Sequence, residues 1–233
     1  MRPLKHGYTN RTLTNDTTVE KTYDGPDAEL RLRRERTLLP HLRDQLPVPP
    51  VLGATATTLK LGFLAGVPGQ ELLDAGHAAK VLASCGKLLR RIHELTPPVP
   101  ALGARRADEV FVHGDFGPNN LLLDPDTFEV TAVVDWEFAH FGAPVEDLAW
   151  CEWIVRTHHP AHRDALSHFF RSYGNEAPPW PVRRAAMLAR CEELRRFCER
   201  AEAGGRGARQ WRERAAATAG WEELSGTWPP PVT

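Results

Sequence analysis

The 233-residue chain has 42% hydrophobic and 25% charged residues, an ordinary composition for a folded protein of one or two domains. Its formal net charge of −1 argues against a general nucleic-acid binder, because such proteins usually carry a strong basic excess. No apolar run approaches the roughly 18 residues of a membrane helix, and the N-terminal residues lack the apolar stretch of a signal peptide, so we expect a cytoplasmic protein with no membrane partner.

The first part of the chain is predicted to form strands followed by one helix. Residues 3–23 are rich in Thr, Tyr and Val and lack helical periodicity, which favours strands. A helix is expected over residues 27–46, with Asp27 as its cap and with Pro40 as the point where it kinks or splits. The apolar side of this helix is predicted from three leucines: Leu30, Leu38 and Leu42.

A change of pattern near residue 65 predicts a boundary between two lobes. Residues 47–51 are predicted to form an extended connector, residues 56–64 a strand, and the Gly-Val-Pro-Gly sequence at 66–69 a turn. We therefore expect a first lobe over residues 1–65 and a second lobe over residues 66–233.

The second lobe is predicted to be mainly helical, with short strands near its start. Residues 74–95 form the clearest helix of the chain, because their apolar residues recur with a period of 3.6. Residues 110–134 predict three short strands, with a turn between the second and the third. Four further helices are expected over residues 144–157, 161–173, 182–203 and 207–220.

The residues best suited to carry chemistry lie in two segments of the second lobe. The sequences VHGDFGPNNLLLD at 112–124 and VVDWEFA at 133–139 each place an acidic residue beside a short apolar strand. Asp115, Asn120 and Asp135 offer two carboxylates and an amide, whose hard oxygen atoms suit Mg²⁺. One of the carboxylates is instead a candidate for accepting a proton from a substrate hydroxyl.

These segments resemble the motifs of a family of small-molecule kinases. The patterns H-G-D-x-x-x-x-N, V-x-D-W-E and G-x-P-x-x-D-L-A follow one another between His113 and Trp150, as in the aminoglycoside phosphotransferase and choline kinase family. The resemblance implies an α+β, two-lobed protein-kinase-like fold, with a small β-rich nucleotide-binding lobe and a mainly helical lobe for catalysis and acceptor binding. It also implies that the γ-phosphoryl group of ATP is transferred, with Mg²⁺ as cofactor, to a hydroxyl of a small molecule of the antibiotic, amino alcohol or sugar type.

The same resemblance gives each motif residue a role. Asp115 is implied to be the catalytic base, and Asp147 a structural brace. Asn120 and Asp135 are implied to be the Mg²⁺ ligands, since the kinase spacing of five residues after the aspartate selects Asn120 rather than Asn119.

The N-terminal lobe resembles the nucleotide site of the family. GYTN at 7–10 is similar to its phosphate-covering loop, and Val19-Glu20-Lys21 to its V-x-K strand. Lys21 would hold the α- and β-phosphates and pair with Glu35, or with Glu29 as the alternative. FLAGVPGQELL, from residue 63, resembles the hinge that contacts adenine through its backbone. The implied nucleotide-binding residues are Gly7, Thr9, Asn10, Val19, Lys21, Glu35, Phe63, Leu64 and Leu122.

The acceptor is less well defined. Glu152 and Trp153 follow Asp147 on a predicted helix and form either the acceptor wall or part of the core. Residues 150–233 hold 13 arginines and 10 acidic residues, a net charge of +3, which favours a neutral or singly charged acceptor over a polycation. The sequence does not define the oligomeric state.

Two other functions compete with the small-molecule kinase. A non-catalytic nucleotide-binding pseudokinase is disfavoured because Lys21, Asp115, Asn120 and Asp135 are all present. A protein kinase is disfavoured because only eleven residues, with no Ser, Thr or Tyr, separate Asp135 from Asp147, whereas a peptide-binding activation segment needs roughly 20–30.

Overall fold

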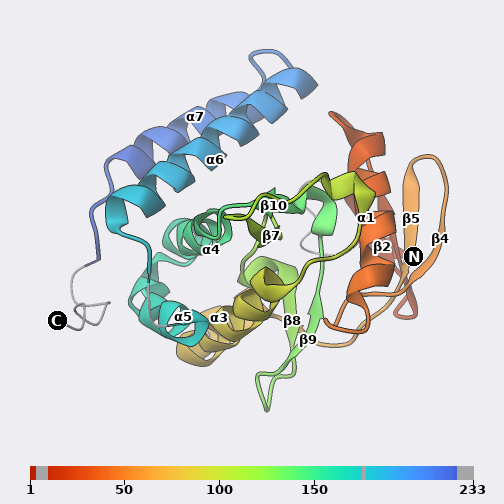
Figure 1. Cartoon of the computed structure of the whole chain (residues 1–233), viewed down its shortest axis with the longest axis horizontal. Coiled ribbons are helices and arrows are strands. Elements are labelled where there is room, and N and C mark those ends of the chain that lie inside the picture. Colours follow the sequence, from red (N-terminus) through yellow and green to blue (C-terminus); the bar gives the residue numbers. More distant parts are fainter. Residues whose placement is uncertain (4–9, 175–176, 225–233) are drawn as a thin grey trace.

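The computed structural model describes residues 1–3, 10–174 and 177–224. Gly7 and Thr9, which the sequence assigns to a phosphate-covering loop, lie outside these residues. The described residues form an N-terminal sheet with one helix, followed by a mainly helical C-terminal lobe (Figure 1). This is the α+β, two-lobed arrangement expected from the sequence.

The N-terminal lobe is built on a five-stranded antiparallel sheet in the order β1-β2-β3-β5-β4. β3 lies in its centre and places Lys21 opposite Leu59 of β5. Because alternate residues of a strand face the same side, Val19 and Lys21 point to one face of the sheet. The strands are β1 Arg2–Pro3, β2 Arg11–Thr14, β3 Thr18–Thr22, β4 Val51–Ala54 and β5 Thr58–Gly62.

Helix α1, Ala28–Leu42, corrects two expectations about its course. It continues past Pro40, which lies close to the helix end. Because proline has no N–H, the carbonyl of Arg36, four residues earlier, receives no helical hydrogen bond. Arg36 is exposed, so water can bind this carbonyl instead. Asp27 occupies the N-cap position, but its side chain makes no capping hydrogen bond and pairs with Arg200 instead.

The apolar face of α1 is also shifted from the prediction. Leu38 and Leu42 are fully buried as expected, whereas Leu30 is 47% exposed. The buried stripe instead runs through Leu32 and Leu39, which lie on the side of the helix that faces the core. Two helical turns of 3.6 residues do not bring Leu30 directly beneath Leu38, so the leucine spacing alone misplaces it.

The segment around the predicted lobe boundary contains two strands that the sequence does not reveal. Residues 47–51, expected to be a connector, lead directly into β4. The predicted turn at 66–69 includes β6, Val67–Pro68, which pairs with β8, Leu121–Leu123, of the C-terminal lobe. Both strands are short and one contains proline, so neither shows a recognisable strand pattern. The boundary near residue 65 remains a prediction.

Helices make up most of the C-terminal lobe. α3 and α5 pack so closely that a Cβ atom on Gly86 would lie 2.2 Å from the carbonyl oxygen of Phe169. Within the described ranges, no helix combines the length and apolar character that a membrane crossing requires. The helices are α2 Gly69–Leu72, α3 Ala78–Glu94, α4 Val145–His158, α5 Leu166–Tyr173, α6 Trp180–Ala201 and α7 Arg206–Ala219.

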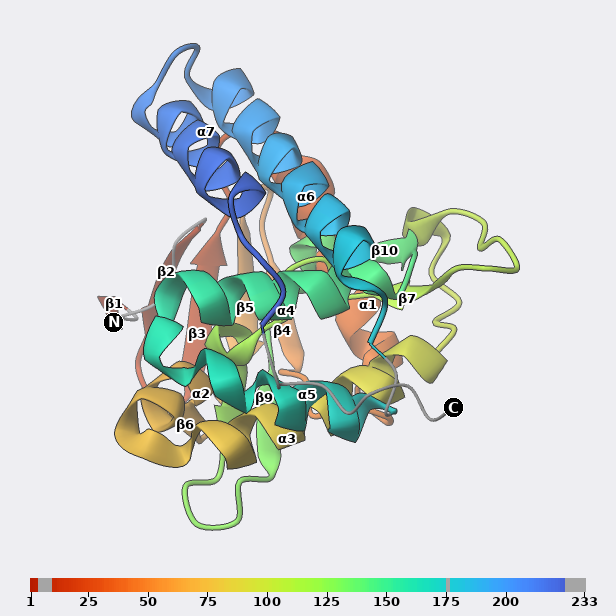
Figure 2. The ribbon, with the colours of Figure 1, turned by 90° about the vertical axis from the view of Figure 1, so that its left-hand side faces the viewer.

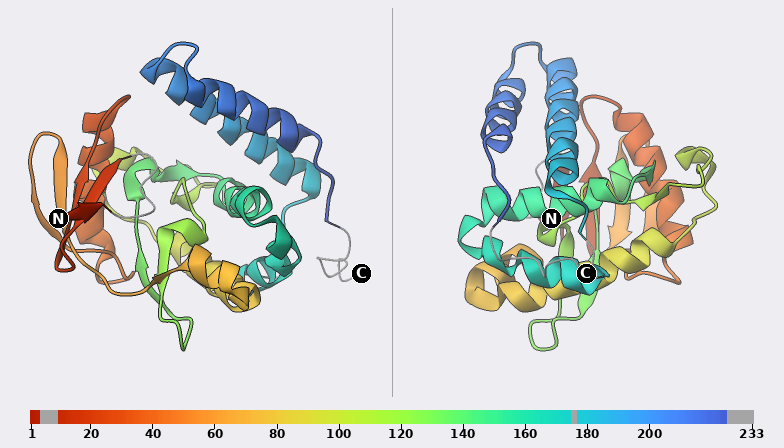
Figure 3. Two further views of the ribbon diagram at one scale, coloured as in Figure 1. Left: turned by 180° about the vertical axis from the view of Figure 1, so that it is seen from behind. Right: turned by 60° about the vertical axis from the view of Figure 1, so that its left-hand side comes forward.

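The last two helices form an antiparallel hairpin that rises from the C-terminal lobe (Figures 2 and 3). α6 begins beside α4 and runs toward the start of α1, where Arg200 forms an ion pair with Asp27 at 2.7 Å (Figure 1). Against α4 the hairpin buries Met187 and Cys191, which share a small core with Trp150 and Trp153.

Two small sheets sit at the centre of the C-terminal lobe. One has the order β6-β8-β9, with β9 at Val130–Val133, and the other pairs β7, Val110–Val112, with β10, His140–Gly142. The three strands predicted over 110–134 are therefore present, but β7 pairs with β10 rather than with β8. These two sheets carry the loops that hold the motif residues.

Candidate active site

The loop between β7 and β8 is fixed in place by a carboxylate from α4. Fully buried Asp147 accepts hydrogen bonds from the backbone N–H groups of His113, at 2.8 Å, and Gly114, at 2.9 Å. Its Oδ2 also lies 3.2 Å from His93 Nε2. Burial alone would raise the pKa of Asp147, but the hydrogen bond from His93 and the nearby charges outweigh it and lower this pKa. The predicted brace is thus present.

Gly114 is required by the geometry of this loop. Its φ is +83°, a conformation that L side chains rarely adopt. A Cβ atom at this position would also lie 2.5 Å from the carbonyl oxygen of Phe138. The glycine of the H-G-D motif therefore lets the loop turn tightly and bring Asp115 to Asn120 and Trp150.

The side chain of Asp115 is hydrogen-bonded at both oxygen atoms. Asn120 Nδ2 donates to Oδ2 at 2.9 Å, and Trp150 Nε1 donates to Oδ1 at 2.7 Å. Burial, with a contribution from the carboxylate of Asp135, raises the pKa of Asp115, and the charge of Arg190 and the Trp150 hydrogen bond oppose this rise. A carboxylate with a raised pKa is a stronger proton acceptor than a free aspartate.

Strands β8 and β9 bring Asn120 and Asp135 to the same end of a small sheet. Leu121 lies opposite Val133, and the N–H of Val134 donates to the carbonyl oxygen of Asn120 at 3.0 Å. Asp135 has a φ of 70°, and its side chain keeps 27% exposure. Within the described ranges, Asn120 Oδ1 and Asp135 Oδ2 have no hydrogen-bond partner. Two open oxygens of this kind fit the ligand preference of Mg²⁺.

Lys21 lies at the centre of a buried group of carboxylates. Its Nζ is 2.6 Å from Glu35 Oε2 and 3.5 Å from Glu137 Oε2, and it also pairs with Asp135 Oδ1. Burial alone would lower the pKa of Lys21, but these carboxylates raise it well above its usual value. The pairing with Glu35 is the one favoured by the sequence, and the alternative partner, Glu29, is exposed.

The three carboxylates around Lys21 also meet the spacing of a metal site. Oxygen atoms of Glu35, Asp135 and Glu137 lie within 4.8 Å of one another. However, the ammonium group of Lys21 is within 3.5 Å of each of them and already supplies the positive charge that they need. We therefore assign this cluster to the lysine rather than to a metal ion.

Glu137 is a residue of the site that the sequence analysis missed. It is fully buried, and its Oε2 accepts hydrogen bonds from Asn10 Nδ2 at 2.7 Å and Arg31 Nη1 at 3.1 Å. Burial and repulsion from Asp135 raise the pKa of Glu137 to about 7. The only signal was its place in the V-x-D-W-E motif, to which no role was given.

This arrangement changes the expected position of Asn10. The residue was predicted to contact phosphates, but it is only 7% exposed, and both atoms of its side-chain amide are used within the protein. Nδ2 bonds to Glu137, and Oδ1 accepts from Arg31 Nη1 at 3.1 Å. The side chain of Asn10 thus ties the start of β2 to the segment that follows β9.

The remaining nucleotide-binding candidates lie around the expected hinge. Phe63 is 36% exposed, and Leu64 and Leu122 are half-buried. A Cβ atom on Gly66 would meet the Cβ of Leu122 at 2.8 Å, which places the hinge against β8. Thr131 Oγ1 donates to the carbonyl of Ala65 at 2.7 Å and holds the hinge to β9.

Glu152 and Trp153 do not form an open acceptor wall. Each is 1% exposed. The carboxylate of Glu152 accepts hydrogen bonds from Arg183 at 2.8 Å and from Arg156 at 3.1 Å. Trp153 is stacked on Trp150, with ring centroids 4.4 Å apart. The α6–α7 hairpin covers this side of α4, which no motif in the sequence indicates, so the core alternative is the one that the structure supports.

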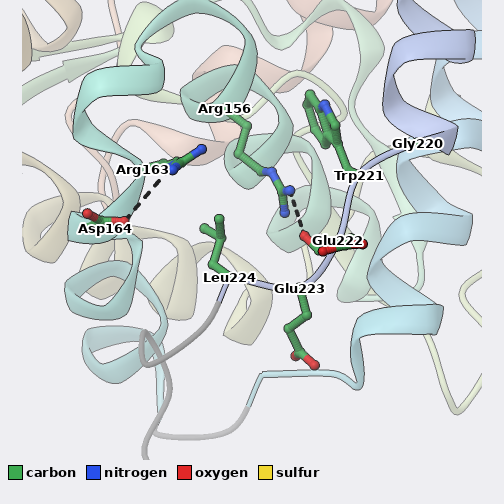
Figure 4. A pocket seen from close by; sticks show the side chains of 8 residues that line it. All are labelled: Arg156, Arg163, Asp164, Gly220, Trp221, Glu222, Glu223 and Leu224. Atoms are coloured by element: carbon green, nitrogen blue, oxygen red, sulfur yellow. Dashed lines mark hydrogen bonds and ion pairs between the residues drawn. The ribbon is translucent and has the colours of Figure 1, made fainter.

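A separate cavity of about 480 Å³ lies between the C-terminal end of α4 and the segment after α7 (Figure 4). Arg156, Arg163 and residues 220–224 contribute to its lining. None of the motif residues lines it. The cavity is therefore distinct from the candidate active site.

Comparison with protein families identifies the motif-bearing part of the chain. The model of the phosphotransferase enzyme family matches residues 1–109 and 99–186. The two matched ranges together cover more than three-quarters of the chain and include every motif residue described above, from Lys21 to Asp147.

Solved phosphotransferases share the fold. The GDP and kanamycin complex of APH(2")-IIia has a TM-score of 0.69 at 12% identity, and the similarity covers 94% of this chain and 92% of that one. The macrolide 2'-phosphotransferase MphH from Brachybacterium faecium has a TM-score of 0.59 at 20% identity and coverages of 96% and 93%. A thermostable mutant of APH(4)-Ia, with ADP and hygromycin B, has a TM-score of 0.65 at 18% identity and coverages of 93% and 92%. The kinase-like, two-lobed fold is thereby confirmed.

Curated proteins match only a short segment. Acyl-CoA dehydrogenase family member 11 of Rattus norvegicus is 48% identical over 42 residues, which are 18% of this chain and 5% of that protein. Acyl-CoA dehydrogenase family member 10 of Mus musculus is 44% identical over 46 residues, which are 20% of this chain and 4% of that protein. The match spans about a twentieth of these relatives or less.

We predict that Asp147→Ala destabilises the protein strongly. The change leaves two buried backbone N–H groups and His93 without their acceptor, which should lower the free energy of unfolding by about 3–5 kcal/mol. Chemical denaturation followed by circular dichroism measures this loss. Glu94→Ala, which removes an exposed pair with Arg90, serves as the control and should cost about 0.5 kcal/mol or less. Equal losses for the two variants would show that Asp147 is not a brace.

Proposed function

The chain belongs to the phosphotransferase enzyme family, and on that premise we propose that it transfers the γ-phosphoryl group of ATP to a hydroxyl of a small molecule. The observation that carries the proposal is the position of Asp115, a half-buried carboxylate with a raised pKa, beside Asn120 and Asp135. The ADP in the APH(4)-Ia structure and the GDP in the APH(2")-IIia structure support a purine nucleotide as the donor.

The donor would bind between the lobes. Lys21, kept charged by its carboxylate partners, would neutralise the α- and β-phosphates. The backbone of the hinge at Phe63 and Leu64 would contact the purine ring of the nucleotide. Mg²⁺ bound by Asn120 Oδ1 and Asp135 Oδ2 would neutralise charge on the phosphates. Glu35 holds the ammonium group of this buried lysine in place before the phosphates arrive, which suits the role.

Asp115 would act on the acceptor. Its carboxylate would orient the hydroxyl toward the γ-phosphorus and accept the hydroxyl proton as the new oxygen–phosphorus bond forms. The bond between the γ-phosphorus and the bridging oxygen breaks, and ADP leaves with that oxygen's electron pair. In such a reaction, positioning and neutralisation of charge supply most of the acceleration.

The segment between Asp135 and Asp147 favours a small acceptor over a protein. Its eleven residues form a short turn at Trp136–Phe138 and then β10, which pairs with β7. The segment is therefore folded into the lobe, and no stretch of it remains for docking a peptide. The assembled Lys21–Glu35 pair and the hydrogen-bonded Asp115 argue against a pseudokinase, since each is a part that catalysis requires.

The charges near the base favour an acceptor that is neutral or singly charged. The described α6 and α7 contain ten arginines and four glutamates. Arg190 of α6 is close enough to Asp115 to oppose the rise in its pKa. Glu152, a candidate for the acceptor wall, is instead paired with Arg156 and Arg183. A polycation would meet more positive than negative charge on this side.

We predict that Asp115→Asn lowers kcat by about 10²–10⁴-fold, because an amide keeps the shape of the side chain but cannot accept the proton. ATP affinity, measured by calorimetry, should stay close to that of the wild type. Asp126→Asn, at an exposed turn, is the control and should retain full turnover. Turnover of Asp115→Asn within threefold of the wild type would contradict the role of Asp115 as base.

We predict that Asp135→Ala abolishes the gain in ATP affinity that Mg²⁺ provides. The variant loses the charged ligand of the proposed metal site. ATP titrations with and without Mg²⁺ measure the gain, and Asp108→Ala, an exposed substitution outside the motifs, should leave it unchanged. An Asp135→Ala protein that keeps the wild-type gain would place the metal elsewhere.

A coupled ADP-release screen tests the acceptor. The compounds should include kanamycin-like polyamines, mono-amino alcohols, uncharged alcohols and sugars, and a peptide library, each with ATP and with GTP. We expect the highest kcat/KM for a neutral or singly charged compound, with little loss at raised ionic strength. If polyamines gave the highest value and lost it in salt, the charge argument would be wrong. Nucleotide binding without turnover on any compound would favour the pseudokinase.

A further inference from the structure

Trp150 contacts the proposed base directly, although no motif assigns it a role. Its indole Nε1 donates a hydrogen bond to Asp115 Oδ1 at 2.7 Å. Asn120 holds the other oxygen at 2.9 Å, so the carboxylate cannot rotate about its Cβ–Cγ bond without breaking a hydrogen bond. Each carboxylate oxygen has two lone pairs, and one on each oxygen therefore stays available for an incoming hydroxyl.

An indole is well suited to this position. It donates one hydrogen bond and has no acceptor atom, so it cannot take the substrate's proton in place of Asp115. Trp150 is also only 4% exposed, and its ring excludes water from one side of the carboxylate. A water molecule or a hydroxyl at the same place would both donate and accept, and it would fix the carboxylate less firmly.

Trp150 is itself held in a stack of three tryptophans. Its ring lies nearly parallel to that of Trp153, with centroids 4.4 Å apart and planes 3° apart. Trp211 of α7 covers both rings, at 6.0 Å from Trp150 and 5.4 Å from Trp153. Aromatic rings packed in this way have little freedom to change rotamer.

The stack is anchored to α7. Trp153 Nε1 donates to Thr218 Oγ1 at 2.9 Å, and the hydroxyl of Thr218 donates in turn to the carbonyl of Arg214 at 2.8 Å. A continuous series of packed rings and hydrogen bonds therefore runs from the C-terminal end of α7 to Asp115. The α6–α7 hairpin therefore supports the Asp115 side chain through Trp150.

From this geometry we propose that Trp150 is a positioning residue for the transfer reaction: its indole N–H fixes the orientation of the Asp115 carboxylate toward the acceptor hydroxyl, and the α7-anchored stack fixes the indole. The inference rests on the proposed function of Asp115 as base. It adds a requirement for Trp150 and for the hairpin that the kinase motifs by themselves do not contain.

Trp150→Phe tests the proposal because it keeps an aromatic ring in the stack and removes only the donor. We expect kcat to fall by about 10- to 100-fold, the effect of losing one hydrogen bond to a charged group, while KM for ATP stays within about twofold. A purely structural role would lower the melting temperature or the active fraction and would not separate kcat from KM in this way.

The matched control is Trp180→Phe. Trp180 of α6 packs against the same small core, but its ring lies near Arg156 and Arg183, outside the stack of three tryptophans. The control should lose some thermal stability and keep kcat within about threefold of the wild type. If both variants lost kcat equally, or if Trp150→Phe kept wild-type kcat, the positioning role of Trp150 would be refuted.

A second measurement is independent of whether Trp150→Phe folds. The indole N–H resonances of the wild type can be followed by proton–nitrogen correlation NMR and compared with those of Asp115→Asn. The Trp150 resonance should move most among the seven tryptophans, because its acceptor loses its charge. A Trp150 resonance that does not move would overturn the proposal.

The outcomes also separate this inference from the proposed function. Turnover is measured with the best acceptor of the screen and, without acceptor, as hydrolysis of ATP. A wild-type protein that transfers phosphate to nothing, water included, would overturn the proposed function and the role of Trp150 together. Wild-type turnover that Trp150→Phe leaves unchanged would overturn the role of Trp150 alone.

Discussion

A buried ammonium group surrounded by carboxylates is the interaction on which the junction of the two lobes depends. Lys21 of β3 meets Glu35 of α1 and the segment at Asp135 and Glu137 that follows β9. Burying any of these charges alone would be costly, so the three parts of the chain must come together for each charge to be paired. The N-terminal sheet, its helix and the C-terminal lobe are thereby aligned around the place where we propose that phosphates bind.

Helix α4 holds the motif residues of the C-terminal lobe in place. Asp147 binds the backbone of the loop that carries Asp115, and Trp150, one turn further along, binds the side chain of Asp115. One helix therefore fixes both the position of Asp115, the proposed base, and the orientation of its carboxylate. Reactions that depend on positioning benefit from such support, since small displacements of a reacting group lower the rate considerably.

The same packing explains why the expected acceptor wall is absent from α4. Helical spacing places Glu152 and Trp153 on one side of α4, but both are buried because another layer of helices covers that side. Here the α6–α7 hairpin provides the layer, and Glu152 becomes the partner of Arg156 and Arg183. Of the charges on the hairpin, that of Arg190 acts on Asp115 and opposes the rise in its pKa.

The sequence by itself determined most of the helices, the two-lobed class and the residues that carry local motifs: Asp115, Asn120, Asp135, Asp147 and the Lys21–Glu35 pair. Each of these belongs to a short pattern or to a strand and helix close in the chain. Only the tertiary structure decided the partners of Asn10, Glu137 and Trp150. Asn10 and Glu137 are 127 residues apart, and the support of Trp150 comes from α7. Periodicity and motif spacing describe neighbours along the chain, whereas the pairing of a buried polar group depends on which distant segments the fold brings beside it.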